Sequence, residues 1–251
     1  MDYKIRYNIN MKATMIIKNI GKLYTCDRKF TILSDAFVAL HHDKIIDFGT
    51  HCLKDWLDPA TAVIDARGEM VTPAFIDSCY TGIVHDRAGD QIRQNRQALH
   101  EMQQHGILTC MTKNASLCQS TLTQDVICYK ENPSTKIIDF DQISTNEIPG
   151  SFLLSCGFGA CKSFIYDLHV PAFFLHECKG ISGKELLMAM TADPAKAFGL
   201  KDRGVIAKGK IGDLLVLQEK DIDTYFQTMG RQPIHRMLKN GIQFYPHWIV
   251  C

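Results

Sequence analysis

Hydrophobic and polar residues alternate along the first seventy residues, and turn-forming residues separate the runs. A period of two is typical of strands that bury one face. The pattern predicts short strands over 15–17, 36–40, 45–48, 62–64 and 70–72. His42–Asp43 and Ala66–Arg67–Gly68 lie where hairpin turns are expected, the second with a glycine that tolerates a positive φ. The N-terminal block is therefore predicted to be mostly β, with residues 1–10 as an extension.

The last fifty residues show the same alternation. An apolar strand is predicted over 213–217, and two further strands, 237–238 and 242–244, flank the hairpin signal Asn240–Gly241. Neither end of the chain has enough strands to cover a sheet face alone. The two ends are therefore expected to form one composite β-sandwich.

The middle of the chain changes to a helical period. Residues 91–105 are predicted to form a helix that ends at Gly106 and has one face formed by Ile92, Asn95, Leu99 and Met102. Ser182 and Glu185 have the spacing of a capping box, so a helix is expected to run from there to residue 190. Asp193 is predicted to cap another helix, with Pro194 in its first turn and Gly199 as its stop. With strands near 71–77, 107–112, 125–129, 136–140 and 151–156, the middle segment is α/β.

Composition excludes several classes of function. The 251 residues include 28 Lys and Arg against 27 Asp and Glu, so no field of one sign favours nucleic acid or an anionic membrane as a partner. The ten cysteines are scattered and no signal-peptide pattern opens the chain, which favours reduced thiols and a cytoplasmic location. The weakly polar stretch 151–161 is shorter than the ~20 residues that cross a bilayer.

Several motifs in order resemble the amidohydrolase superfamily, in particular imidazolonepropionases. The run Val-Thr-Pro-Ala-Phe-Ile-Asp-Ser over 71–78 is similar to the lead-in to that family's first barrel strand, and 83–88 is similar to the stretch that leads to a substrate-binding arginine, here Arg87. Residues 185–200 and 203–216 resemble the last barrel helices and the return into the β-sandwich. The similar regions cover 12–113 and 180–245.

The resemblance implies a shortened fold. A (β/α) barrel of the TIM type normally takes ~250 residues, and 73–200 offers about half of that. We therefore expect a composite β-sandwich domain made of 1–72 with 202–251, and a reduced α/β domain over 73–201 that is a remnant of the barrel. Sheet edges left free by the lost strands predict a homodimer.

The resemblance also implies that the metal ligands are gone. The family's His-x-His pair falls on Cys79 and Thr81, its mid-barrel histidines fall in the missing part, and its final aspartate aligns with Gly157. A metal brings the pKa of bound water from 15.7 to about 7, and zinc needs three or more fixed ligands to do so. We therefore expect no metal and no cofactor, which makes enzymatic activity uncertain.

Two ways to rebuild catalysis are open. His85, His169, His176 and Cys178 are candidates for a new metal site, although ten histidines and ten cysteines also produce chance clusters. Alternatively, Cys79 acts as a nucleophile with His85 as its base. The simpler interpretation is that Cys79 is a small buried residue.

The candidate substrate-binding residues are Arg87, Lys113, Gly157, Gly159 and Lys162. Arg87 suits a carboxylate, and the glycines with Lys162 suit an anion. The leading hypothesis is a pseudoenzyme that binds a small molecule, such as a carboxylate, or a protein partner. The alternatives are an active hydrolase of non-peptide C–N bonds and a structural subunit that pairs with a full-length enzyme.

Overall fold

A computed structural model describes residues 11–83, 88–143, 147–160, 165–231 and 233–245. Strands of the first third are β1 (Met15–Tyr24), β2 (Ile32–His41), β3 (Lys44–Gly49), β4 (Ala62–Asp65), β5 (Met70–Pro73) and β6 (Phe75–Asp77). The middle contains β7 (Ile107–Thr112), β8 (Gln119–Ser120), β9 (Asp125–Cys128), β10 (Lys136–Ile138) and β11 (Phe152–Leu154), and the last part contains β12 (Leu214–Leu217), β13 (Ile234–Lys239) and β14 (Ile242–Tyr245). The helices are α1 (Ala88–Gln104), α2 (Phe140–Ile143), α3 (His169–Lys179), α4 (Gly183–Met190), α5 (Ala192–Ala197) and α6 (Ile222–Gln227), with short 3-10 turns η1 (Leu53–Trp56) and η2 (Ala115–Leu117). Among the described helices, none combines the length and apolar character needed to span a bilayer.

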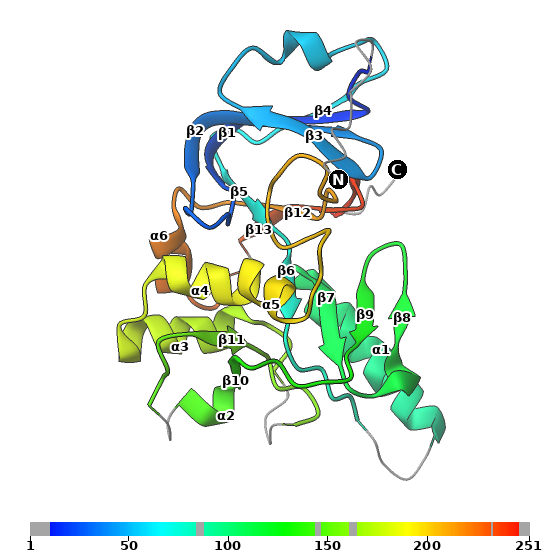
Figure 1. The fold of residues 1–251 in the computed structure, drawn as a ribbon, viewed down its shortest axis with the longest axis vertical. Helices are drawn as coiled ribbons and strands as arrows, with labels where there is room; N and C mark the ends of the chain where they lie inside the picture. The colour runs from blue at the N-terminus through cyan, green and yellow to red at the C-terminus, as the bar shows by residue number, and fades with distance from the viewer. Residues whose placement is uncertain (1–10, 84–87, 144–146, 161–164, 232, 246–251) are drawn as a thin grey trace, which may run out of the picture.

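Strands from both chain ends share one sheet. The order is β14-β13-β12-β5-β1-β2-β3, with β4 also paired to β1. The seam between the ends is the antiparallel pair of β5 with β12, in which Met70 lies opposite Leu217. The two ends thus meet in one sheet with a continuous hydrogen-bonded path (Figure 1), and the composite sandwich stays a prediction.

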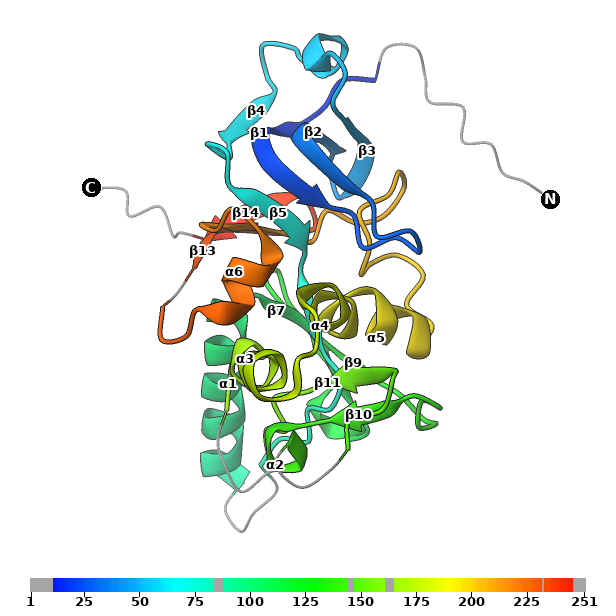
Figure 2. The same ribbon diagram turned by 90° about the vertical axis from the view of Figure 1, so that its left-hand side faces the viewer.

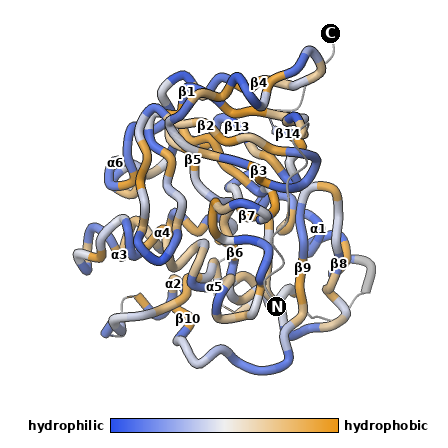
Figure 3. The backbone as a smooth tube through the Cα atoms, turned by 45° about the horizontal axis from the view of Figure 1, so that its top comes forward, coloured by the Kyte–Doolittle hydropathy of each residue, from blue (hydrophilic) through white to orange (hydrophobic). Residues whose placement is uncertain are grey.

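The seam strand β12 is buried on both faces. Leu214 and Val216 pack into a core within the curved sheet, together with Ile17 and Leu40. Leu215 and Leu217 point the other way, into the large core shared with the α/β segment. Hydrophobic stretches follow the strands of this sheet in Figure 3. The expected division into 1–72 with 202–251 and 73–201 stays a prediction, because the larger core lies across both of its boundaries.

The α/β segment contains parallel pairs of barrel type. β6 pairs with β7 and β7 with β9, all parallel, while β10 pairs with β11 in a second parallel sheet. The Ser78 amide donates to the Leu154 carbonyl at 3.2 Å, which brings the carboxyl ends of β6 and β11 together. In Figure 2, α1 lies along one side of these strands, away from α4 and α5. In the described part of the chain the parallel strands form these two sheets and not a closed ring.

Several local predictions are confirmed. The Asn240–Gly241 hairpin joins β13 to β14 with positive φ at both residues. Ser182 and Glu185 form the expected capping box at the start of α4. Gly106, with a φ of 80°, follows the end of α1.

Three local predictions are wrong. Arg67–Gly68 does not make a hairpin. β4 and β5 both pair in parallel with β1, so this turn joins two strands that follow one another along β1. Asp193 lies inside α5, and Thr191 takes the N-cap position. Ile92 is 60% exposed, because α1 turns that position away from the core that Leu99 and Met102 enter.

Candidate functional site

The strand β6 ends in a buried carboxyl group. One oxygen of Asp77 accepts the Cys79 amide at 2.9 Å and the Ser155 hydroxyl at 3.0 Å, and the other accepts the Cys156 amide at 2.6 Å. Burial raises the pKa of Asp77, and the hydrogen bonds from the Cys156 and Cys79 amides only partly oppose this. The donors that hold Asp77 are thus neutral, and they tie β6 to the residues that follow β11.

Cys79 lies two residues after Asp77 and donates its amide to that carboxyl group. Its Sγ is 3.9 Å from the Thr81 Oγ1. Burial, followed by the nearby Asp77 carboxyl, raises the pKa of the Cys79 thiol. A raised pKa keeps the thiol protonated at neutral pH, and the thiol is a far weaker nucleophile than the thiolate. Burial and the same cysteine also raise the pKa of Tyr129, to about 12.

The residues present do not fit the metal that the amidohydrolase family implies. At the two positions that resemble the metal-binding histidines stand one thiol and one neutral hydroxyl. The hydroxyl is a poor ligand for a divalent ion, and a single thiol leaves the ion undercoordinated. Both Asp77 oxygens are already engaged by protein donors. Within the described ranges, no group of three or more His, Cys, Asp or Glu side chains is placed to hold a metal ion.

The two predicted anion-binding glycines have structural roles. The Gly157 amide donates to the Ser155 hydroxyl at 2.9 Å, so it is not available to a ligand. Gly159 has a φ of 83°, and a Cβ there would lie 2.1 Å from the Gly82 carbonyl oxygen. This close approach, with the Thr81 amide donating to the Phe158 carbonyl at 3.1 Å, packs the turn after β11 onto the segment after β6.

The other predicted site residues divide into two groups. Lys113 follows β7, and its Nζ lies 5.9 Å from the centre of the Tyr129 ring, next to Cys79. His85, Arg87 and Lys162 lie outside the described residues. The structure therefore brings together Cys79, Lys113 and Gly157 at the carboxyl ends of the parallel strands.

The remaining histidines serve the packing of α3. His169 Nε2 is 2.7 Å from the Tyr225 carbonyl, and His176 Nδ1 is 2.7 Å from the Ile181 carbonyl. His176 and Cys178 lie two positions apart on a helix, so their side chains point in different directions. These contacts support the simpler interpretation of both histidines.

A cavity opens at the same end of the strands, between α1 and η2. Its volume is about 410 Å³. The lining combines polar and apolar groups: Gln91, Arg96, Asn114, Ser116, Ile92, Leu99 and Leu117. Asn95 holds its wall, because its side-chain amide accepts the Ile83 N–H at 2.8 Å and donates to the Ile83 carbonyl at 3.1 Å. Exposed Ile92 thus faces a cavity, which the helical period alone did not indicate.

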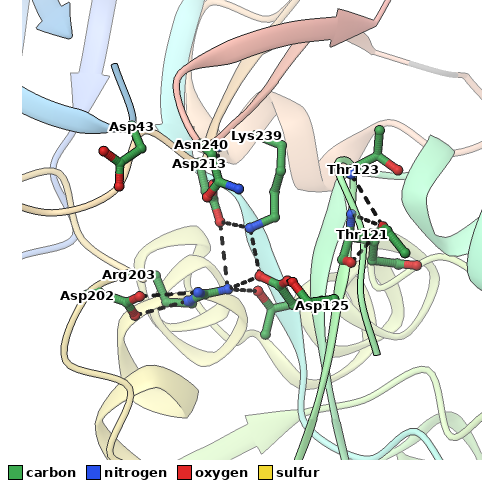
Figure 4. Close-up of polar contacts among 12 residues, drawn as sticks. Asp43, Thr121, Thr123, Asp125, Asp202, Arg203, Asp213, Lys239 and Asn240 are labelled. Atoms are coloured by element: carbon green, nitrogen blue, oxygen red, sulfur yellow. Dashed lines mark hydrogen bonds and ion pairs between the residues drawn. The ribbon is translucent and has the colours of Figure 1, made fainter. Parts of the chain in front are cut away.

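The second polar centre is an ion cluster that sequence reasoning missed. Lys239 Nζ lies 2.7 Å from Asp125 and 2.8 Å from Asp213, and Arg203 Nη1 lies 2.7 Å from the same Asp125 oxygen (Figure 4). Lys239 is 1% exposed. Burial alone would raise the pKa of Asp125, but hydrogen bonds from Arg203 and Lys239 hold it below its ordinary value. The cluster joins β9 to β12 and β13, and its only sequence signal is a lysine in an apolar strand beside Asn240–Gly241.

Comparison with solved structures defines the fold class. A Xaa-Pro dipeptidase with methionine bound in its active site superposes with a TM-score of 0.67 at 11% identity, covering 92% of this chain and 99% of that chain. An enamidase of the amidohydrolase superfamily superposes with a TM-score of 0.66 at 15% identity, covering 91% of this chain and 95% of that chain. The protein therefore has the fold of the amidohydrolases.

Sequence comparison narrows the relationship. The chain is 35% identical over 85 residues to an imidazolonepropionase of Fusobacterium nucleatum subsp. nucleatum, which covers 30% of this chain and 20% of that protein. It is 36% identical over 62 residues to an imidazolonepropionase of Deinococcus deserti, which covers 25% of this chain and 16% of that protein. No family model matches. The chain is thus imidazolonepropionase-like, and the matched segments span a fifth or less of these curated relatives.

Proposed function

We propose that the protein is a binding protein built on a reduced amidohydrolase barrel, and that it has lost metal-dependent C–N hydrolysis. The observation that carries this proposal is the cavity of about 410 Å³ between α1 and η2. It lies at the carboxyl ends of β6 and β7, the end at which barrels of this type place their ligands. The centre beside it, around Asp77, is filled by the protein's own hydrogen bonds.

The cavity lining suggests the chemistry of the ligand. Arg96 supplies a cation that, among the described residues, has no ion-pair partner. A guanidinium group binds a carboxylate through two parallel N–H donors. Ile92, Leu99 and Leu117 supply an apolar wall for the rest of the molecule. A small ring compound with a short carboxylate arm combines both features, and the imidazolonepropionase-like sequence favours the same class.

The binding test uses imidazole-4-propionate as the probe and calorimetric titration as the readout. Arg96→Gln should weaken binding about tenfold or more, because a charge-assisted bidentate contact contributes about 1.5–3 kcal/mol. Arg93→Gln is the matched control, since Arg93 is an exposed arginine of the same helix that does not line the cavity. Equal affinities for the wild type and Arg96→Gln would contradict the carboxylate role of the cavity.

Loss of hydrolysis is tested separately. The purified protein should bind less than one zinc, iron or manganese per chain and leave imidazolonepropionate intact. Replacing Cys79 and Thr81 by histidine should not restore turnover, because two ligands cannot hold a catalytic metal. Chelator-sensitive turnover would contradict the proposal, and turnover that resists chelator but vanishes in Cys79→Ser would support thiol catalysis instead.

We also propose that the protein is a homodimer. β8 is an edge strand of the sheet with the order β6-β7-β9-β8, and β10 is an edge strand of the two-stranded sheet. Gln119, Ser120 and Lys136 on these strands are exposed. Exposed strand edges are usually paired or covered. Light scattering at micromolar concentration should give twice the mass of one chain, and a monomer would contradict this proposal.

A further inference from the structure

Two cysteines meet at one end of the β8–β9 hairpin. In this antiparallel pair Gln119 lies opposite Val126, Cys118 directly precedes β8, and Cys128 ends β9. Both are free and exposed. Extended by one position, the hairpin register sets Cys118 opposite Ile127, so the backbones of Cys118 and Cys128 lie diagonally across adjacent strands.

The contacts of the two thiols converge on one turn of the chain. Cys118 Sγ lies 3.8 Å from the Asn114 carbonyl, and Cys128 Sγ lies 3.9 Å from the adjacent Lys113 carbonyl. Burial, followed by the nearby Cys128 thiol, raises the pKa of the Cys118 thiol. Both residues line one cavity of about 620 Å³, so a small reagent can reach them together.

We propose that Cys118 and Cys128 form a reversible disulfide through exchange with low-molecular-weight disulfides of the glutathione class. One protein thiolate attacks a sulfur of oxidised glutathione, which breaks that S–S bond and releases one glutathione thiolate. The second protein thiolate then attacks the protein sulfur of the mixed disulfide and releases the second glutathione. The protein loses two protons and two electrons, and oxidised glutathione is reduced to two thiols.

The hairpin favours this closure over simple modification. The Thr121 amide donates to the Gln124 carbonyl at 2.9 Å, which fixes the turn between the two strands. The second thiol is therefore held beside the first at a high effective concentration. Cys52 and Cys178 are also free and exposed, but they lie beside η1 and on α3, where neither adjoins this hairpin.

The chain offers a direct readout of the bond. Trypsin cuts after Lys113 and Lys130, so one peptide, 114–130, contains both cysteines and no other cleavage site. The intact protein is equilibrated with reduced and oxidised glutathione, its remaining thiols are alkylated, and the peptides are weighed. The disulfide makes peptide 114–130 lighter by two hydrogen atoms and blocks both alkylations.

We expect this peptide to become oxidised at about a tenfold lower proportion of oxidised glutathione than modifies Cys52. In Cys118→Ser or Cys128→Ser, the remaining thiol should instead carry glutathione, as Cys52 does, while Cys52→Ser should leave the internal bond unchanged. Peptide 114–130 bearing one or two glutathiones and never losing two hydrogens would overturn the proposal. The test needs no ligand, so its outcome is independent of the proposed binding function.

Discussion

The two polar centres described above hold a buried carboxyl group with opposite kinds of partner. At the carboxyl end of β6, Asp77 is held by neutral amide and hydroxyl donors, and its pKa is raised. Where β9 meets the composite sheet, Asp125 is held by Arg203 and Lys239, and its pKa is lowered. A carboxyl group held by neutral donors depends on those hydrogen bonds to offset its burial, whereas a paired carboxylate depends on its cations.

The largest loss of folding stability should follow from removing a cation of the ion cluster. Lys239→Met leaves Asp125 and Asp213 with one partner fewer in a fully buried place, and breaking such a pair costs about 3–5 kcal/mol. Urea unfolding measures the loss. Lys54→Met, at an exposed lysine of η1, is the control and should change stability by less than about 0.5 kcal/mol. A Lys239→Met protein as stable as the control would show that the ion cluster does not stabilise the contact of β9 with β12 and β13.

A smaller loss should follow from Asp77→Asn. The new amide would place an N–H₂ group against either the Cys156 amide or the Ser155 and Cys79 donors, and one unsatisfied buried donor costs about 1–3 kcal/mol. Asp35→Asn, at an exposed position of β2, provides the comparison. Unfolding free energies that match for the two variants would remove Asp77 from the set of groups that hold β6 to β11.

The smallest effect should appear in the pH dependence. The raised pKa of Asp77 means that the folded protein still binds this proton above pH 3.8, where the unfolded chain releases it. Asp77 therefore stabilises the folded protein at low pH, and this contribution is lost as the pH rises through the native pKa. The lowered pKa of Asp125 acts in the opposite direction, and its contribution is lost as pH falls below 3.8. Stability curves from about pH 3 to pH 7 for Asp77→Asn and Asp125→Asn should therefore deviate from the wild type with opposite slopes. Parallel curves would contradict the contrast between the two centres.

Local signals in the sequence predicted local structure well. The capping box of Ser182 and Glu185 and the Asn240–Gly241 hairpin involve residues a few positions apart, and both are present. Arg67–Gly68 was a correct turn signal with the wrong consequence, because pairing of β4 and β5 with β1 depends on residues some fifty positions away. The residues of a turn do not specify which strand the chain pairs with after the turn.

The candidate site was only partly predictable for the same reason. Cys79 was found through the resemblance to the family's metal-binding pair. It lies two residues after β6 and Lys113 directly follows β7, and such positions gather at one end of a parallel sheet. Two partners of Asp77, Ser155 and Cys156, are 78 and 79 positions away in the sequence. Lys239 and Asp125 are separated by 114 positions, and no short motif contains such a pair.

The seam between β5 and β12 sets a condition on the order in which the protein forms during synthesis. About 140 residues separate the two strands, yet β12 supplies the edge that β5 lacks and completes both cores. At about 5–20 residues per second, a ribosome needs roughly 7–28 s to make the intervening chain. During that interval the nascent N-terminal strands present an open, apolar edge, which is the form of β-structure most prone to pair with a neighbouring chain. We therefore predict that mispairing of this fold is most frequent while the polypeptide is still growing.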